Sequence, residues 1–318
     1  MGINILINDN FSTFSVSETP GAAEFFYYKA GSFVANDGSV LSGPNGTTIG
    51  SVPYTLSTTN GTDHAKFLAY SSKSYDLPTN GELISEVVMS GRVTGVECNP
   101  FPVQLVPNPQ SDYRLACFGQ ANINFAHLVT SDLIMTNDVI YALYEILPEY
   151  KPSFGGPGPD YASFSSQIPV GCRKDLDENG YVTLSIAYNR SQGIIRYLVN
   201  GEERYRTPRV GFYPDPQYIT NNFGGPQVAI DLDNINLGFG TFTLLDYTLP
   251  SNNCCDRSAL IALFDPKLYH NPCDVPCLPQ YSNQSLYIYD PSANINNRLF
   301  GQGAYMNLKR RVVYTVTC

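Results

Sequence analysis

The fold of this chain is decided by two runs, Tyr181-Val-Thr-Leu-Ser-Ile-Ala-Tyr188 and Ile194-Ile-Arg-Tyr-Leu-Val-Asn-Gly-Glu-Glu-Arg-Tyr-Arg-Thr207. In the first run, apolar side chains at 182, 184, 186 and 188 alternate with small or polar ones at 183, 185 and 187. Such a period of two is typical of a strand with one buried face.

The second run contains Asn200-Gly201 between two strand-like halves. Asn and Gly tolerate positive φ, so this dipeptide suits the tight turn whose twist matches paired strands. The two runs therefore predict three successive antiparallel strands and an all-β fold.

The bulk composition suits one large β domain. The chain has 318 residues, of which 43% are hydrophobic and 15% charged, below the roughly 25% charged residues of an average domain. There is no internal repeat and no low-complexity linker. We expect a single domain over residues 1–318, with long loops and a cysteine-rich loop insert at about 250–280.

Other segments with strand-like composition are spread along the whole chain. They are 3–7, 66–70, 82–93, 115–125, 128–135, 235–247, 286–289 and 301–317. Residues 139–147 are apolar at both odd-numbered and even-numbered positions, which fits a short helix or a strand buried on two sides. Their β-branched and aromatic content favours the strand.

The net charge of −9 argues against nucleic acid as a partner, because an acidic surface repels phosphates. The only dense basic run, Lys309-Arg310-Arg311, is interpreted as a solvated strand edge.

No window approaches the 18 apolar residues of a membrane-spanning helix. Residues 1–10 lack the basic start and apolar core of a signal peptide.

The eight cysteines point to an oxidising environment. Four of them lie in a proline-containing stretch, and Cys318 is the last residue; the candidates for disulfides are Cys254, Cys255, Cys273, Cys277 and Cys318. Zinc is a weaker alternative because the paired short spacing of common zinc sites is missing, and free thiols are another. Disulfides would suit an extracellular or oxidising surface reached after release, and they could join subunits into a homo-oligomer.

Several short motifs resemble those of a family of uncharacterised bacterial and fungal proteins in the concanavalin A-like lectin/glucanase group, with a LamG-like jelly roll. The motifs are Asn8-Asp-Asn-Phe11, Asp138-Val-Ile-Tyr-Ala-Leu-Tyr-Glu145, Tyr197-Leu-Val-Asn-Gly-Glu-Glu203, Leu237-Gly-Phe-Gly-Thr241 and Phe300-Gly-Gln-Gly-Ala304. The resemblance implies a jelly-roll sandwich of two curved antiparallel sheets. It leaves activity open, because the group holds sugar-binding proteins, glycosidases and structural modules.

Enzymes of that group resemble one another in a Glu-x-Asp-x-Glu strand, where two carboxylates act as nucleophile and acid/base. The nearest run here, Glu82-Leu-Ile-Ser-Glu86, has Ile84 at the central position. Glu145, with Glu149, could form a different pair. Glu82, Glu86 and Glu145 are therefore the weak catalytic candidates, and solvated glutamates are the simpler interpretation.

A possible cation site lies at Asp175, Asp177 and Asn179, which match the first ligands of a calcium loop, with Gly180 at its sixth position. The glutamate expected at the twelfth position is Ile186. A polar turn is favoured, and calcium is the alternative. No motif anchors any other cofactor.

We expect a non-catalytic jelly-roll binding module with carbohydrate as its ligand, because Tyr, Phe and Asn are abundant. The absence of Trp, the favoured sugar-stacking residue, weakens this expectation. Two alternatives stay open. One is a self-assembling coat or fibre protein cross-linked by disulfides, and the other is a divergent glycoside hydrolase.

Overall fold

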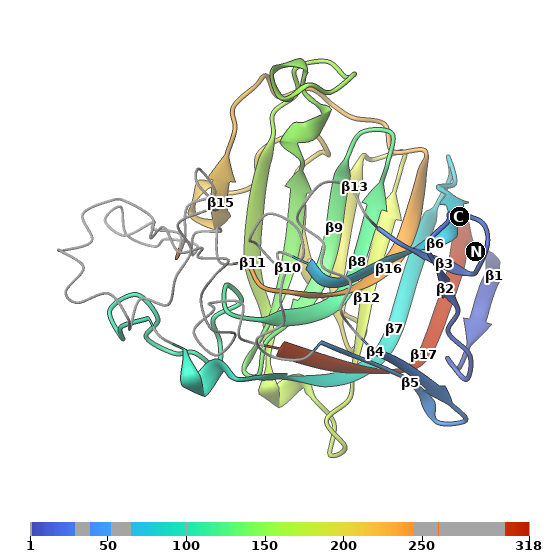
Figure 1. Ribbon diagram of the computed structural model, residues 1–318. Helices are drawn as coiled ribbons and strands as arrows, with labels where there is room; N and C mark the ends of the chain where they lie inside the picture. The colour runs from blue at the N-terminus through green and yellow to red at the C-terminus, as the bar shows by residue number, and fades with distance from the viewer. Residues whose placement is uncertain are drawn as a thin grey trace.

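Two β-sheets packed face to face form the protein in this computed structural model (Figure 1). The structure describes residues 2–28, 39–51, 65–99, 101–244 and 303–317, together with Leu260. The all-β jelly-roll sandwich expected from the sequence is confirmed. The predicted insert at about 250–280 and the predicted strand at 286–289 lie outside the described residues, Leu260 excepted.

The first sheet, sheet A, contains the hairpin that the sequence predicts. Its strands, in spatial order, are β14 (Glu202–Arg206), β13 (Ile194–Val199), β12 (Val182–Asn189), β7 (Glu82–Thr94), β17 (Gly303–Thr317), β5 (Gly46–Ser51) and β4 (Ser39–Gly43). An eighth strand, β1 (Gly2–Asp9), also pairs with β17. Strands from both ends of the sequence therefore build this layer, and the two chain ends lie close together (Figure 1).

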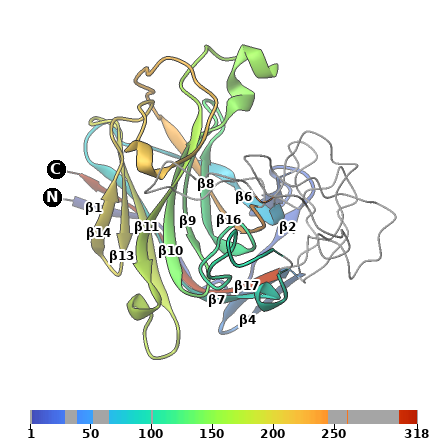
Figure 2. The same ribbon diagram turned by 90° about the vertical axis from the view of Figure 1, so that its left-hand side faces the viewer.

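The second sheet, sheet B, has nine strands. In spatial order they are β15 (Ile219–Asn222), β11 (Phe164–Cys172), β10 (Val139–Ile146), β9 (Val129–Met135), β8 (Cys117–Asn124), β16 (Asn234–Phe242), β6 (Ala65–Asp76), β3 (Phe25–Tyr27) and β2 (Val16–Ser17). Figure 2 shows β8, β9, β10 and β11 side by side. The described pairings are antiparallel except for the two-residue β2–β3 contact at the edge.

The described helices are single 3₁₀ turns in the loops. They are η2 (Val96–Cys98), η3 (Pro148–Tyr150), η4 (Pro152–Phe154), η5 (Arg173–Asp175) and η6 (Pro216–Tyr218). Within the described ranges, no helix has the length and apolar character that crossing a membrane requires.

The turn between β13 and β14 has the predicted backbone. Asn200 and Gly201 both have positive φ, 53° and 79°, as a two-residue hairpin turn of this kind requires. The Asn200 side chain also accepts a hydrogen bond from the Thr183 amide (3.0 Å) and donates to the Asp175 carbonyl (2.6 Å). The turn is thereby tied to the loop before β12.

The apolar run at 139–147 is the strand β10, buried on both faces. One face packs into the core between the sheets through Ile140, Ala142, Tyr144 and Ile146. The other face carries Tyr141 and Leu143, which belong to a second apolar cluster made of sheet B residues and adjoining loops. We call this second side, turned away from sheet A, the outer face of sheet B.

The prediction that Lys309-Arg310-Arg311 is a solvated strand edge is wrong for Arg311. β17 lies inside sheet A, with β7 on one side and β5 and β1 on the other. A register shift against β7 between Leu308 and Arg310 inserts one extra residue, and this bulge reverses the inside–outside alternation. Lys309 and Arg310 are both exposed, whereas Leu308 and Arg311 both point inward.

The buried guanidinium of Arg311 lies between two aromatic rings. Its Cζ is 5.3 Å from the ring centroid of Phe11 and 5.2 Å from that of Phe25. It forms ion pairs with Asp9 (3.2 Å) and Glu24. Stacking and the ion pairs at Nη2 offset part of the cost of burying this charge, whereas Nε and Nη1 are buried without a hydrogen-bond partner among the described residues.

Candidate functional site

Two carboxylates lie next to each other on the outer face of sheet B. Asp132 of β9 is paired with Leu143 of β10, and Glu145 of β10 is paired with Thr130 of β9. Asp132 and Glu145 are therefore diagonal neighbours on one face, where backbones are about 7–8 Å apart. Both are almost fully buried, at 7% and 5% exposure.

Each carboxylate is held by hydrogen bonds from neighbouring strands. The backbone amide of Asn122 donates to Oδ1 of Asp132 (2.9 Å). Thr130 donates its hydroxyl to Oε2 of Glu145 (3.0 Å), and Nε2 of Gln167 donates to Oε1 of Glu145 (3.5 Å). Four adjacent strands, β8 to β11, thus position the pair.

Burial and mutual repulsion alter the protonation of this cluster. Burial, and then the charge of Glu145, raise the pKa of Asp132 well above its usual value, although the Asn122 amide opposes the shift. Burial and the charges of Asp132 and Glu145 also raise the pKa of the Cys117 thiol. The pKa of Tyr70 is raised by burial first and then by Asp132. Asp132 therefore keeps its proton to a higher pH than a solvent-exposed aspartate does.

Aromatic side chains border the carboxylates on the side of β6. We call Phe26, Tyr28, Tyr70 and Phe125 the aromatic rim. Tyr70 is perpendicular to both Tyr28 and Phe125, with ring centroids 5.3 Å and 5.4 Å away. Tyr70 is buried, and the other three rings are partly exposed.

A glycine makes room for the central ring of the rim. Gly238 of β16 is paired with Tyr70 on one side and Ala121 on the other. A Cβ at this position would lie 2.4 Å from Cδ1 of Tyr70 and 2.5 Å from the Ala121 carbonyl oxygen. The motif Leu237-Gly-Phe-Gly-Thr241 therefore has a steric role beneath the site.

On the side of β11, a loop closes over the outer face. Tyr113 donates its hydroxyl to Oε1 of Gln167 (3.3 Å) and its ring is perpendicular to that of Tyr141 (5.0 Å). The neighbouring ion pair of Asp112 and Arg114 (2.6 Å) is itself buried. This loop is fixed by side-chain contacts as well as by backbone.

The arrangement brings together a carboxyl group of raised pKa, a second carboxyl group, an amide and a hydroxyl beside aromatic rings. Such groups can donate and accept hydrogen bonds with sugar hydroxyls, while rings offer apolar faces. A protonated acid beside a second carboxylate is also the pairing that general acid catalysis needs.

The sequence candidates are distributed over both sheets. Glu82 and Glu86 lie on β7, on the face of sheet A turned away from the core, whereas Glu145 lies on the outer face of sheet B. The whole sandwich separates them. Glu82 forms an ion pair with Arg196, and Glu86 accepts from the Ser185 hydroxyl (3.4 Å).

The calcium candidates lie in the turn before β12, and backbone donors already occupy two of their carboxylates. Asp175 accepts from the Cys172 amide (2.8 Å), and Asp177 accepts from the amides of Asn179 (2.8 Å) and Tyr181 (2.9 Å). In the part of the chain that the structure describes, no three His, Cys, Asp or Glu side chains are grouped to hold a metal ion. Calcium at this turn stays a prediction.

The disulfide candidates Cys254, Cys255, Cys273, Cys277 and Cys318 all lie outside the described residues. Cys117 and Cys172 are described as free thiols, the first buried and the second exposed. Cross-linking through disulfides therefore stays a prediction.

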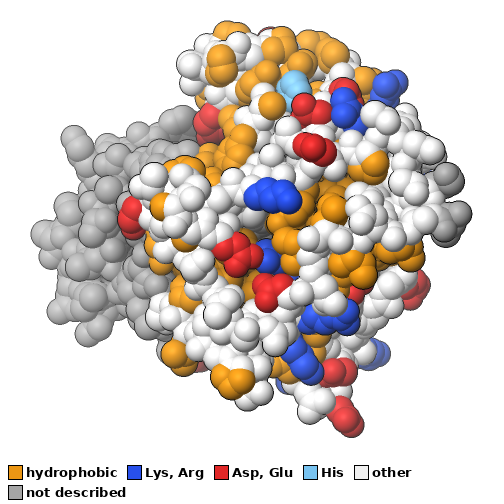
Figure 3. All heavy atoms as spheres, turned by 90° about the vertical axis from the view of Figure 1, so that its right-hand side faces the viewer, with side chains coloured by type: hydrophobic (Ala, Val, Ile, Leu, Met, Phe, Trp, Pro, Cys, Tyr) orange, Lys and Arg blue, Asp and Glu red, His pale blue; other side chains and the backbone are white. Residues whose placement is uncertain are grey.

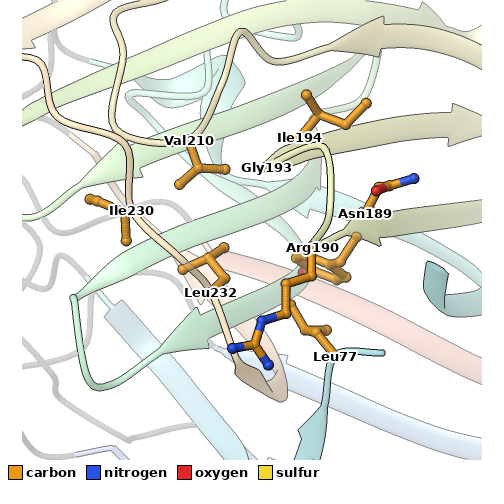
Figure 4. A pocket seen from close by; sticks show the side chains of 9 residues that line it. Leu77, Asn189, Arg190, Gly193, Ile194, Val210, Ile230 and Leu232 are labelled. Carbon is orange, nitrogen blue, oxygen red and sulfur yellow. The ribbon is translucent and has the colours of Figure 1, made fainter. Parts of the chain in front are cut away.

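A small crevice lies at the opposite end of β12 from the calcium turn (Figure 4). Its lining includes Leu77, Arg190, Val210, Ile230 and Leu232, with a free volume of about 10 Å³. This volume admits about one water molecule. The crevice is therefore a packing feature and not a ligand site.

The sequence singled out Glu145 but missed Asp132 and Gln167. The signal in the sequence was Asp132, a charged residue within the otherwise uncharged strand Val129-Thr-Ser-Asp-Leu-Ile-Met135. Pairing this strand with 139–146 in the register of a short hairpin would have placed Asp132 diagonal to Glu145.

Comparison with solved structures finds similar arrangements at low sequence identity. An endo-1,3-β-glucanase from Streptomyces sioyaensis is 11% identical, with a TM-score of 0.48, and the match covers 100% of this chain and 98% of that chain. A Bacillus licheniformis β-glucanase is 9% identical, with a TM-score of 0.42, covering 98% and 97%.

Among curated proteins, uncharacterized protein L829 of Acanthamoeba polyphaga mimivirus is 28% identical, over 88% of this chain and 82% of that protein. The sequence motifs predict membership of an uncharacterised family, and this is confirmed. The model of DUF6081, a family of unknown function, matches residues 8–317, and the protein therefore belongs to that family.

Proposed function

We propose that the protein binds carbohydrate without turning it over, at the outer face of sheet B. The observation that carries the proposal is the diagonal pair of Asp132 and Glu145 beside the aromatic rim. Ligand sites typically combine apolar and aromatic walls with a few convergent polar groups. Here the walls are tyrosine and phenylalanine rings, and the polar groups match the hydroxyls of a sugar.

The partly exposed rings give the ligand a place to dock. Phe26, Tyr28 and Phe125 keep part of their surface accessible, and the ring centroids of Tyr28 and Phe26 lie 5.7 Å and 6.2 Å from that of Phe125. A pyranose ring has apolar C–H faces that pack on such rings, while its hydroxyls reach toward Asp132 and Glu145. Nearly buried carboxylates form stronger hydrogen bonds than exposed ones.

The test is a glycan array probed with the wild-type protein and the variants Asp132→Asn and Glu145→Gln. We expect selective binding by the wild type and at least tenfold weaker binding by each variant. Glu82→Gln is the matched control, because Glu82 lies on the other sheet. Flat binding across the array, or equal loss in the Glu82→Gln control, would refute the proposal.

Glycoside hydrolysis is a second candidate, favoured by the raised pKa of Asp132 beside Glu145. Asp132 and Glu145 are diagonal neighbours on one face, and glycoside hydrolases use two carboxyl groups that lie close together. Asp132 would donate the proton to the leaving oxygen, and Glu145 would act as nucleophile or base. Release of reducing sugar from a polysaccharide panel, abolished by Asp132→Asn but not by Glu86→Gln, would establish it; no release from any glycan would exclude it.

A further inference from the structure

An interval between β5 and β1 along β17 brings together two segments that are far apart in sequence. β5 pairs with residues 304–308 of β17, and β1 pairs with residues 311–317 on the same side. Lys309 and Arg310 pair with neither β5 nor β1. The two strands leave an interval there, in which β17 has no strand partner on this side.

The bulge of β17 places both cations of this interval at the surface. Because of the register shift after Leu308, Lys309 and Arg310 are exposed side by side instead of alternating between the two faces. The side chain of Arg311, the next residue, is directed into the core. Of the three basic residues in Lys309-Arg310-Arg311, the first two are therefore exposed to solvent, and the third is buried in the core.

The interval opens into a hollow of about 510 Å³ lined by Asn8, Asp9, Asn10, Lys309 and Arg310. This volume is within the range of about 300–1,000 Å³ that small-molecule sites occupy. Figure 3 views the molecule from the side on which β1 lies in Figure 1, and shows basic, acidic and apolar side chains interspersed on that face.

The charge of the hollow is positive. Its one carboxylate, Asp9, is already engaged, because Oδ2 pairs with Arg311 (3.2 Å) and Oδ1 accepts from the Phe11 amide (2.9 Å). Among the residues that the structure describes, Lys309 and Arg310 form no ion pair. The ammonium of Lys309 lies over the ring of Tyr181 at 4.9 Å, and Tyr181 does not line the hollow, so the guanidinium of Arg310 is the cationic group of the hollow.

The hollow also has neutral polar groups. The Nε of Arg310 donates to Oδ1 of Asn8 (3.3 Å), which holds the guanidinium beside β1. Oδ1 of Asn10 accepts from the Ser12 amide (3.1 Å). With both amide oxygens engaged, the amide nitrogens of Asn8 and Asn10 are the groups left to donate to a ligand.

We propose that this hollow binds an acidic saccharide, with the carboxylate of a uronic acid on Arg310 and ring hydroxyls on Asn8 and Asn10. A guanidinium recognises an oxyanion, and its fork of donors matches a planar carboxylate. The volume exceeds that of a single inorganic anion, and the amides recognise hydroxyls. The site lies on the other sheet, so it does not rest on the function proposed above.

The experiment is an amide NMR titration of the full chain with three probes: glucuronate, glucose and inorganic sulfate. We expect glucuronate to shift the amides of residues 8–10 and 309–310, with glucose and sulfate each at least tenfold weaker. Arg310→Gln should weaken glucuronate at least tenfold, since a charge-assisted contact is lost. Asn10→Ala should weaken glucuronate but not sulfate.

The control is Lys174→Gln, which removes an exposed cation elsewhere on the surface. Thermal melting of each variant checks that it is folded. No shift at residues 8–10 and 309–310 would overturn the proposal, as would equal loss in Lys174→Gln. Sulfate binding as tightly as glucuronate would overturn the assignment of a saccharide.

Discussion

Asp132 on β9 and Glu145 on β10 lie diagonally across one strand pair, on the face of sheet B that does not contact sheet A. A sandwich needs only its inner faces to be apolar. Two nearly buried carboxylates on an outer face have no role in joining the sheets, and burying them destabilises the protein. This relationship underlies the proposed function and sets the pH dependence of stability.

The first prediction concerns the stability of Asp132→Asn against pH. The folded-state pKa of Asp132 is raised, so between the unfolded value of about 3.9 and the folded value the native state binds more protons. Unfolding free energy contributed by this group is therefore greatest at acid pH and is lost as pH rises. In thermal melts, the melting temperature of Asp132→Asn should rise relative to that of the wild type from pH 4 to pH 8.

Asp231→Asn provides a control of opposite sign. Its hydrogen bond from Arg190 lowers the pKa of Asp231, so its contribution is present at neutral pH and lost on acidification. This variant should lose stability relative to the wild type as pH rises through the range below about 4, and the difference should then stay constant up to pH 8. A pH-independent difference for Asp132→Asn, or a variant that loses stability relative to the wild type as pH rises, would contradict the position of Asp132.

The second prediction concerns Arg311. Replacing it by Ala removes the contacts with Phe11 and Phe25 and leaves a cavity, and we expect a loss of about 2–4 kcal/mol in chemical denaturation. Arg311→Met keeps most of the side-chain volume, so its loss of unfolding free energy should be less than half of that for Arg311→Ala. Arg310→Ala, at the exposed neighbour, should change stability by no more than about 0.5 kcal/mol. Equal effects at 310 and 311 would show that the bulge is misplaced.

The third prediction tests the hairpin turn. Proline at position 200 is incompatible with a φ of 53°, and the substitution also removes the two side-chain hydrogen bonds of Asn200. Asn200→Pro should destabilise the protein by about 3 kcal/mol or more, measured as a lower melting temperature. Asn200→Gly keeps the backbone conformation and should cost less. An unchanged melting temperature for Asn200→Pro would refute the strand assignment here.

The fourth prediction concerns the glycine beneath the aromatic rim. Gly238→Ala places a methyl group within 2.6 Å of Tyr70 and two backbone oxygens, so the protein should lose about 1–3 kcal/mol. Gly43→Ala is the matched control, because its Cβ would have no atom within 4 Å. A similar melting temperature for both variants would show that Tyr70 does not lie over Gly238.

Much of the fold could be predicted because it depends on local signals. Alternation at 182–188 and the Asn200-Gly201 turn are readable without knowledge of any partner strand. The burial of Arg311 could not be predicted, since it depends on a bulge defined by pairing with β7. The same limit applies to the site: Glu145 stood in a recognisable motif, but its neighbour Asp132 follows only from the β9–β10 register.

The most direct test of the central claim uses the absence of tryptophan from the chain. Phe125→Trp places a single fluorophore in the aromatic rim, in contact with Tyr28 and Tyr70, and Tyr305→Trp places one on an exposed position of β17. Titration with the glycan selected by the array should shift or quench the emission of Phe125→Trp and leave Tyr305→Trp unchanged. Unchanged emission at position 125, or the same change at both positions, would contradict carbohydrate binding at the outer face of sheet B.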